Sequence, residues 1–291
     1  MKEFVRTVLA VFLGVLLAGI ILLPKIMSVN PYIATFEKDR VVRALMTPVT
    51  FILKEKTYAV TKQKEYECER SRSTAFTIKK AGYLLTNNHN VAISTETEKT
   101  CYEKIAKELN VSENLAKTMI IGLRAEYTLT NEQSRTFPVK VFHTFPKDDI
   151  AVLKIPEKET GIIKNWEYVP FRTEAIEIVD GKVIPSPNNL PPTILKDEPV
   201  VTMGEPIGFS FTLTEGKMGN STFTDDEGVH YAHAVIPLNG GNSGGAVISL
   251  LDIHIIGMAT IVVKDHGENS LQSGIIPFYE IEKALKSIGI E

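Results

Sequence analysis

The pattern of hydrophobic residues separates an apolar amino-terminal segment from a longer part of mixed polarity. Residues 8–23 form an unbroken apolar run, VLAVFLGVLLAGIILL, and the run extends to Phe4 if Arg6 reaches toward the lipid headgroups. At a rise of about 1.5 Å per residue, a helix of this length spans roughly 24 to 30 Å, which is close to the thickness of a bilayer core. We therefore expect residues 1–28 to be a transmembrane anchor.

A cleavable signal peptide is the alternative interpretation of this segment. Residues 24–27, which follow the run, contain no small-x-small cleavage pattern, and this favours the anchor. Lys2 and Arg6 precede the run, offset by Glu3, while Lys25 follows it. This mild charge bias favours an amino terminus on the inside and a main domain on the outside of the membrane.

Short runs of β-branched and aromatic residues, separated by turn formers, predict strands in most of the remaining chain. Before them, residues 29–65 mix charged and apolar residues without a strong period, and we expect this segment to be a stalk without catalytic chemistry. The clearest predicted strands cover residues 74–78, 83–86, 137–142, 150–155, 199–203 and 246–250.

Two segments between residues 95 and 123 have helical spacing instead. They cover residues 102–109 and 112–117, and Ser112 is placed to cap the second, so we expect a helical insertion here. Four prolines and two asparagines in 185–192 predict a long irregular connection.

The carboxy-terminal end has the pattern of a short amphipathic helix. The helical pattern covers residues 281–286, and the apolar side chains of Ile281, Leu285 and, just beyond it, Ile288 share one face. We expect this helix to pack against the preceding domain.

Composition and charge are those of a folded globular protein. Hydrophobic residues make up 44% of the chain and charged residues 23%, and the formal net charge is −3. No basic run interleaved with aromatic residues is present, so we expect no nucleic-acid partner. The histidines outside the blocks described below show no metal-ligand spacing, and HExxH is absent, so we expect no metal and no cofactor. These are His143, His230, His233, His254 and His266.

The strongest local signal is the sequence GGNSGG at residues 240–245, which is followed by an apolar strand. One interpretation is a glycine-rich turn that joins two strands. The other is catalytic: the glycines let the amides of Gly241 and Ser243 converge beside the Ser243 hydroxyl, where they can stabilise the oxyanion of an acyl-transfer intermediate. The turn alone does not decide between the two.

A serine nucleophile requires a histidine base and a carboxylate that orients the imidazole ring. His89 follows a predicted strand, and Asp148 and Asp149 both precede the apolar run 150–155. Each residue alone has an ordinary structural explanation. Together, however, His, Asp and Ser follow one another in the chain order of one protease fold, each at the end of a strand.

Three blocks of the sequence resemble the catalytic blocks of the HtrA/DegP branch of trypsin-like serine proteases. They are GYLLTNNHNV, DDIAVLKI and NGGNSGGAV, and the resemblance extends from about residue 73 to residue 288. It implies His89 as the general base, Ser243 as the nucleophile and the amides of Gly241 and Ser243 as the oxyanion hole. It also implies Asp149 as the orienting acid, because the aspartate of the family lies immediately before its hydrophobic-Ala-Val-Leu run.

The same resemblance implies a mainly β fold of two antiparallel six-stranded barrels with the active site between them. Adding the other predictions gives a trypsin-like domain over 66–291, with a helical insertion in its first lobe. We expect the first barrel at about 66–165, a connection at 166–195, the second barrel at 196–276 and a terminal helix at 277–289.

The chain departs from the family pattern at several points. Asn90 replaces an apolar residue and Ala246 a common proline, and neither change removes a catalytic group. The helical insertion is longer than family members typically carry. No PDZ domain is expected after Glu291, so regulation by a carboxy-terminal peptide-sensing domain is not expected.

Specificity, the cysteines and the partners complete the expectations. Pro237 and Leu238 precede the nucleophile without an acid that would bind a basic side chain, so we expect aliphatic residues at the cleaved position.

Cys68 and Cys101 either form a disulfide, as an exported domain permits, or remain buried thiols. Expected partners are unfolded or exposed polypeptide segments, the membrane and further copies in a homo-oligomer. A catalytically silent binding or chaperone module of the same fold is the alternative.

Overall fold

The computed structural model describes residues 31–160, 166–187, 191–224, 228–264 and 271–290. The chain consists of two compact units, residues 1–47 and 48–291, which we treat separately. In the first unit, the described part contains the helix α2 (Pro31–Met46). The expected membrane anchor at 1–28 lies outside the described residues. Among the helices that are described, none combines the length and the apolar character required to span a bilayer.

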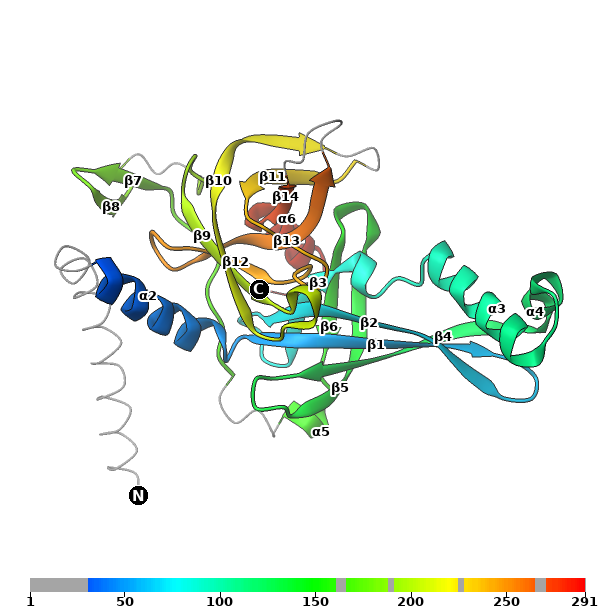
Figure 1. Ribbon diagram of the computed structural model, residues 1–291. Coiled ribbons are helices and arrows are strands. Elements are labelled where there is room, and N and C mark those ends of the chain that lie inside the picture. The colour runs from blue at the N-terminus through cyan, green and yellow to red at the C-terminus, as the bar shows by residue number, and fades with distance from the viewer. Residues whose placement is uncertain (1–30, 161–165, 188–190, 225–227, 265–270, 291) are drawn as a thin grey trace, which may run out of the picture. The chain divides into compact units, whose positions relative to one another are not determined.

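The first barrel of the second unit is a closed antiparallel sheet of six strands (Figure 1). Their order around the barrel is β1–β2–β3–β6–β5–β4. In that order the strands cover Thr50–Val60, Glu65–Thr77, Tyr83–Asn87, Ile150–Lys154, Thr136–Phe145 and Gly122–Thr130. The predicted strands at 83–86, 137–142 and 150–155 are thus confirmed within one or a few residues.

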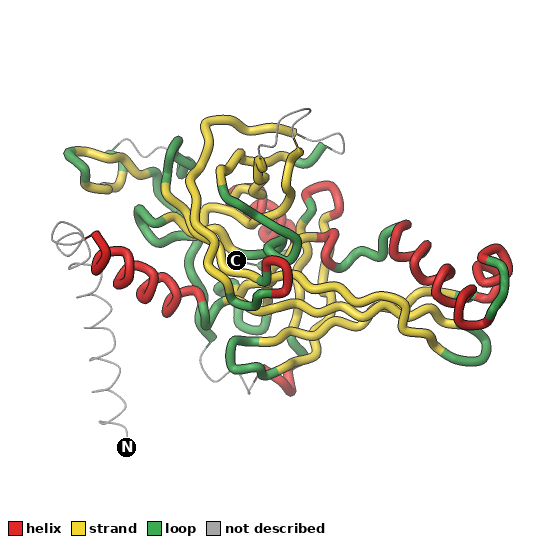
Figure 2. The backbone as a smooth tube through the Cα atoms, viewed as in Figure 1, coloured by secondary structure: helices red, strands yellow, loops and turns green. Residues whose placement is uncertain are grey.

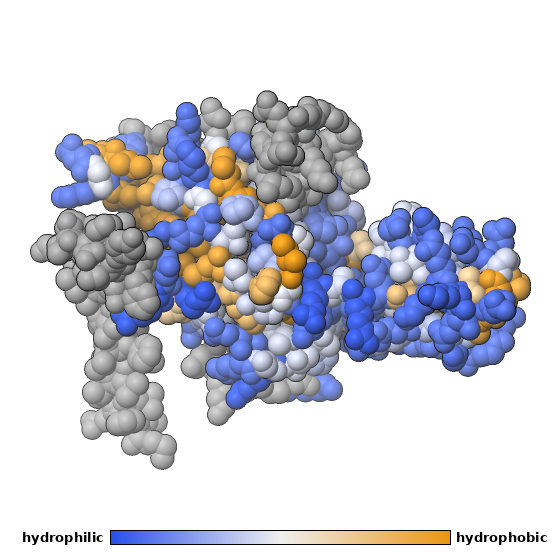
Figure 3. All heavy atoms as spheres, viewed as in Figure 1, coloured by the Kyte–Doolittle hydropathy of each residue, from blue (hydrophilic) through white to orange (hydrophobic). Residues whose placement is uncertain are grey.

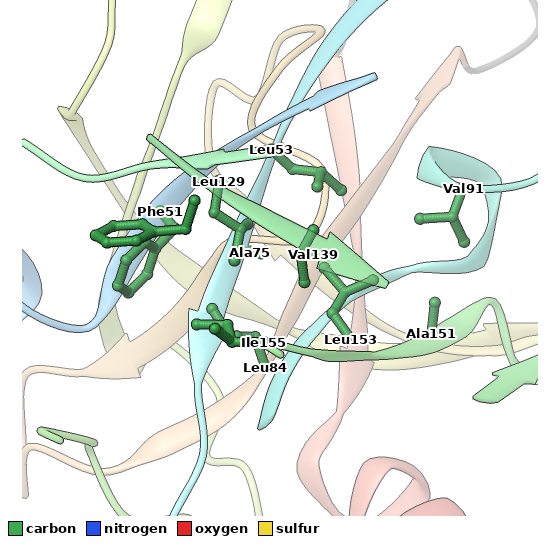
Figure 4. Packing of buried hydrophobic residues seen from close by; sticks show 11 residues of the cluster. Phe51, Leu53, Ala75, Leu84, Val91, Leu129, Val139, Ala151, Leu153 and Ile155 are labelled. Atoms are coloured by element: carbon green, nitrogen blue, oxygen red, sulfur yellow. The ribbon is translucent and has the colours of Figure 1, made fainter. Parts of the chain in front are cut away.

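Apolar side chains from opposite strands fill the interior of this barrel (Figure 4). Leu84 of β3 pairs with Leu153 of β6, and both are fully buried together with Leu53 of β1 and Leu129 of β4. Burying a leucine side chain stabilises the fold by about 1.5 to 3 kcal/mol. This core fixes the register of β3 and β6, whose ends carry two of the candidate catalytic residues.

The expected stalk at 29–65 is wrong, because β1 lies inside this range. Its first residues, 50–53, are buried, and β1 pairs with β2 on one side and with β4 on the other. The charged residues Lys54, Glu55 and Lys56 interrupt the apolar pattern in the middle of the strand, so the sequence did not predict it. The first barrel therefore begins at Thr50 rather than near residue 66.

The predicted helical insertion between β3 and β4 is confirmed and consists of α3 (Thr95–Leu109) and α4 (Glu113–Met119) (Figure 2). The Ser112 hydroxyl caps α4 by accepting a hydrogen bond from the amide of Leu115, at 3.3 Å. A disulfide joins Cys101 of α3 to Cys68 of β2, with 4.8 Å between their Cα atoms. Around it, a small core fastens the helices to the long β1–β2 hairpin, while their outer surface is largely hydrophilic (Figure 3).

The second barrel is also a closed antiparallel sheet, with the strand order β10–β11–β14–β13–β12–β9. In that order the strands cover Thr212–Thr224, His230–Val235, Leu271–Pro277, Ile255–Lys264, Ala246–Ser249 and Pro199–Gly204. The terminal helix α6 (Phe278–Ser287) buries Phe278, Ile281 and Leu285, which confirms the predicted amphipathic helix. The two six-stranded barrels and this helix confirm the expected fold class for the domain.

The connection between the barrels is more ordered than expected. It contains a hairpin of β7 (Ile176–Val179) and β8 (Lys182–Pro185), over which apolar side chains gather at the surface (Figure 3). Short helical turns elsewhere complete the fold. They are η1 (Asn88–Asn90), η2 (Pro146–Asp148), α5 (Glu157–Thr160) and η3 (Pro206–Gly208).

A buried ion cluster fastens this connection to the second barrel. Arg172, fully buried, pairs with Glu198 and with Asp252, at 2.8 Å from its Nε to Oδ2 of Asp252. Burial raises the pKa of the Asp252 carboxyl, but hydrogen bonds from His254 and Arg172, together with their positive charges, outweigh burial and hold this pKa well below its usual value. All polar groups of this cluster face a charged partner, which is the arrangement of a structural ion cluster.

Candidate active site

Two glycines of the turn at 239–245 occupy positions where no other residue fits. Gly241 has a φ of +100°, and a Cβ there would lie 2.0 Å from the carbonyl oxygen of Glu205. Gly244 has a φ of +86°, and a Cβ there would lie 2.1 Å from the carbonyl oxygen of Thr74. Both the backbone conformation and the close approach of neighbouring backbone require glycine. The turn is therefore pressed against the first barrel on one side and against the 205–208 loop on the other.

Hydrogen bonds to the carbonyl oxygens fix the orientation of this turn. The Gly240 carbonyl accepts from the amide of Ile207 at 3.0 Å, and the Gly241 carbonyl accepts from the Thr74 hydroxyl at 2.7 Å. In a trans peptide the carbonyl and the following N–H point in opposite directions. The Gly241 amide therefore points away from Ile207. Neither the Gly241 amide nor the Ser243 amide donates a hydrogen bond to any of the described residues.

His89 and Asp149 are brought together by the pairing of β3 with β6. Asn87 at the end of β3 lies opposite Ile150 at the start of β6, so the residues just beyond these two positions meet. His89 Nδ1 lies 2.9 Å from Oδ2 and 3.1 Å from Oδ1 of Asp149, and its amide donates to Oδ1 at 3.0 Å. A carboxylate only accepts, so this pairing favours the tautomer in which Nδ1 carries the ring proton and Nε2 is free to accept one.

Asp149 is the aspartate that the structure places beside His89. It adopts a left-handed conformation, with a φ of +49°, directly after η2, and it is buried. Its Oδ2 also accepts a hydrogen bond from the Thr260 hydroxyl at 2.9 Å. No hydrogen bond or ion pair joins Asp148 to His89 within the described chain. The carboxylate of Asp149 is thus held by partners from both barrels.

The Ser243 hydroxyl lies in the same region but is bonded elsewhere. It donates to the carbonyl oxygen of Thr260 at 2.9 Å. No hydrogen bond joins it to His89 among the residues that the structure describes. The His89 side chain is 46% exposed. Rotation of Ser243 about χ1 between staggered positions redirects its hydroxyl. Such looser geometry without a substrate is common at acyl-transfer sites.

Several residues that position the site were not predicted from the sequence. Thr260 contacts both Asp149 and Ser243, and Asn90 Nδ2 donates to the carbonyl of Ser243 at 3.1 Å. Thr260 is a polar residue within the apolar run of β13, which is a signal that the sequence offered. Asn90 was noted only as a departure from the family pattern.

The two residues expected to line the specificity pocket have different surroundings. Leu238 is only 1% exposed and packs in the core of the second barrel, whereas Pro237 is exposed. Leu238 therefore contributes to the core that supports the nucleophile turn.

The remaining histidines have local contacts. His143 packs against the ring of Phe145, His230 lies 2.8 Å from the Thr224 hydroxyl and His254 contacts Asp252. His233 lies close to Gly219, where a Cβ would be 2.1 Å from its Nδ1. His266 lies outside the described residues. Across the part of the chain that is described, no cluster of three His, Cys, Asp or Glu side chains could hold a metal ion.

Two closed six-stranded barrels, with a His–Asp pair and a glycine-flanked serine between them, are the fold and site expected of a two-barrel serine protease. Residues 73–258, more than half of the chain, match the family described as trypsin-like peptidase domain. The chain belongs to this family.

Individual relatives are similar to this chain over part of their length. A probable periplasmic serine endoprotease DegP-like from Pseudomonas fluorescens is 25% identical over 183 residues, which cover 62% of this chain and 27% of that protein. A protein of the same description from Rhizobium meliloti is 25% identical over 210 residues, covering 69% of this chain and 30% of that protein. The chain thus matches less than a third of the length of these relatives.

Solved structures agree with this assignment at the level of the fold. The HtrA-type protease AlgW with a decapeptide has a TM-score of 0.54 and 19% identity, over 84% of this chain and 65% of that chain. The same protease with a tripeptide has a TM-score of 0.53 and 20% identity, over 84% and 61%. At these identities the likeness concerns the fold alone.

Proposed function

We propose that this chain is a serine endopeptidase that hydrolyses peptide bonds through Ser243, His89 and Asp149. The observation that carries the proposal is the joint placement of three elements. The His89 ring is hydrogen-bonded to the buried carboxylate of Asp149. Thr260 joins that carboxylate to the nucleophile, because its hydroxyl donates to Asp149 and its carbonyl accepts from the Ser243 hydroxyl. The amides of Gly241 and Ser243 have no acceptor among the described residues. These are the parts that acyl transfer requires.

The first chemical step forms the acyl-enzyme. Ser243 Oγ attacks the carbonyl carbon of the substrate while His89 Nε2 takes the hydroxyl proton, and the carbonyl oxygen becomes an oxyanion. Each amide donor that faces this oxyanion contributes about 3 to 4 kcal/mol of transition-state stabilisation. The imidazolium then gives its proton to the departing amine as the carbon–nitrogen bond breaks. Asp149 stays ionised and stabilises the imidazolium.

Hydrolysis of the acyl-enzyme completes the reaction. A water molecule gives a proton to His89 Nε2 and attacks the ester carbon, and the proton returns to Ser243 Oγ when the ester bond breaks. The products are a new carboxylate and a free serine. No cofactor enters these steps.

Cleavage of an unfolded protein tests the proposal. The full-length chain, purified in detergent, is expected to degrade casein, and Ser243→Ala is expected to abolish this activity. If the wild-type chain leaves casein intact, or if Ser243→Ala degrades it equally well, the proposal is wrong.

We extend the proposal to specificity and location. The exposed Pro237 offers no charge to a basic substrate side chain, and the buried Leu238 beside it adds none, so small to medium aliphatic residues are favoured at the cleaved position. The apolar run at 8–23, the Cys68–Cys101 disulfide and relatives that are named periplasmic support a membrane-anchored protease whose catalytic domain lies outside the cytoplasm. Cleavage of a peptide library mainly after Arg or Lys would contradict the specificity.

The alternative is a binding or chaperone module that retains the fold but not the reaction. In such a module the Ser243 hydroxyl would stay bonded to the Thr260 carbonyl when a polypeptide binds, instead of turning toward His89. Casein that remains intact but is protected from aggregation would support this alternative.

A further inference from the structure

Glu205 is a buried carboxylate next to the nucleophile turn. Its side chain has no exposed surface, and its Oε2 has no hydrogen-bond partner among the described residues. The other oxygen, Oε1, accepts a hydrogen bond from Nη1 of Arg72 at 2.7 Å. Buried carboxylates are strongly unfavourable unless they are paired and hydrogen-bonded. Glu205 therefore depends on a single cation within the described chain.

Another buried glutamate of the same barrel shows how a purely structural carboxylate is satisfied. Glu198 receives hydrogen bonds from Nη1 and Nη2 of Arg172 and from the amide of Leu195. Arg172 is itself buried, whereas Arg72 is 57% exposed and comes from β2 of the first barrel. The Glu205 pair is thus incompletely satisfied and joins one barrel to the other, and such exceptions are concentrated at functional sites.

The backbone of Glu205 is in direct contact with the Gly240–Gly241 peptide. Its carbonyl oxygen lies 2.0 Å from the position of a Cβ on Gly241, and its amide approaches the Gly241 carbonyl at 3.4 Å. Two residues later, the Ile207 amide donates to the Gly240 carbonyl at 3.0 Å. Any displacement of Glu205 therefore changes the contacts on both sides of the Gly241 amide.

The loop that carries these contacts is held in an unusual conformation. Ile207 has a φ of +52°, which β-branched residues rarely adopt, and its side chain is exposed. An exposed side chain does not impose such a conformation. The surroundings of the loop must impose it, and the loop enters the domain through the buried side chains of Glu205 and Pro206.

We propose that Arg72 is a positioning residue for the proposed protease. Its guanidinium supplies the counter-charge that keeps the Glu205 carboxylate buried, and this holds the 205–208 loop against the Gly240–Gly241 peptide. Without Arg72, the unpaired carboxylate moves toward water and the Ile207–Gly240 hydrogen bond is lost. The peptide between the two glycines is then free to rotate, and the Gly241 amide leaves the oxyanion site.

The inference rests on the proposed function, and a set of four variants of the full-length chain tests it. Arg72→Met removes the cation, Glu205→Gln removes the buried charge at constant shape, and a double variant combines both. Arg70→Met is the matched control, because Arg70 lies on the same strand and pairs with Glu67 at the surface. The measurements are kcat and KM for casein, the rate of labelling by a fluorophosphonate probe, and the melting temperature.

We expect Arg72→Met to lower kcat and the labelling rate about 10²- to 10³-fold, because one oxyanion donor is displaced, with KM changed by less than about twofold. Arg70→Met is expected to match the wild type. The double variant is expected to recover most of the lost rate, since the neutral amide that replaces the Glu205 carboxylate needs no counter-charge.

Three results would overturn the inference while leaving the proposed function intact. They are an Arg72→Met variant as fast as the wild type, a double variant as slow as Arg72→Met, or a raised KM at unchanged kcat, which indicates a direct substrate contact. A fall in melting temperature without a change in kcat would likewise reduce Arg72 to a structural role. If the wild type is neither labelled nor active, the failure belongs to the proposed function.

Discussion

The His89–Asp149 pair and the Ser243 turn are positioned by different kinds of contact. His89 and Asp149 lie at the facing ends of two adjacent strands of one barrel, and the register of those strands brings them together. Ser243 lies in a turn whose carbonyl oxygens are held by Thr74 and Asn90 of the first barrel and by the 205–208 loop. The acid–base half is therefore set mainly by the strand register of the first barrel, with one hydrogen bond from Thr260 of the second, whereas the nucleophile half depends on several contacts between barrels.

This difference predicts how the two halves respond to change. A strand register enclosed in a packed core shifts only if the barrel unfolds. A turn held by a few hydrogen bonds and one ion pair can rearrange while both barrels stay folded. In the proposed protease the turn is therefore the half that can change while both barrels stay folded, and substitutions are expected to separate the two halves.

The largest effect is expected in the acid–base half. Asp149→Asn lets the side chain donate to His89, which leaves the imidazole in the wrong tautomer, and kcat is expected to fall about 10⁴-fold. Casein cleavage under saturating substrate measures it.

Asp148→Asn is the matched control for this variant, since its side chain is not bonded to His89 in the described structure, and it is expected to retain activity. A loss in Asp148→Asn with an active Asp149→Asn would reverse the assignment of the acid.

A smaller effect is expected when the oxyanion turn is displaced. In Gly241→Ala the new methyl group meets the Glu205 carbonyl, so the turn must shift, and kcat is expected to fall about 10² to 10³-fold. Gly240→Ala is its control, because nothing lies within 4 Å of a Cβ at that position. Equal losses in the two variants would show that the close approach to Glu205 does not matter for the reaction.

The smallest effect is expected at Asn90. Asn90→Val removes one hydrogen bond to the Ser243 carbonyl and leaves that of the Thr74 amide at 2.9 Å. A neutral hydrogen bond contributes about 0.5 to 1.5 kcal/mol, so kcat is expected to fall about two- to tenfold.

Asn90→Asp, which adds a negative charge beside that carbonyl, is expected to lose more activity than Asn90→Val. Full activity in both variants would show that Asn90 does not position the nucleophile.

The catalytic blocks were readable from the sequence because each is local. His89, Asp149 and Ser243 lie beside short apolar strands whose boundaries the pattern predicts, and the two helices of the insertion carry their own caps. The β1 strand was missed because charged residues occupy its middle. The β7–β8 hairpin was missed because prolines near it indicated an irregular segment.

The residues that position the site depend on contacts that no local pattern contains. Thr260 and Asp149 are 111 residues apart, and Arg72 and Glu205 are 133 residues apart. Such pairs form only when the two barrels meet. The direction of the Ser243 hydroxyl is likewise a property of the folded site, since it depends on the Thr260 carbonyl.

The most direct test of the account is to map where a fluorophosphonate reacts with the full-length chain. Intact mass followed by peptide mapping is expected to show one adduct per chain on Ser243, with labelling slowed in Asp149→Asn and absent in Ser243→Ala. An unlabelled wild-type chain, or an adduct that persists in Ser243→Ala, would contradict the central claim that Ser243 is the activated nucleophile.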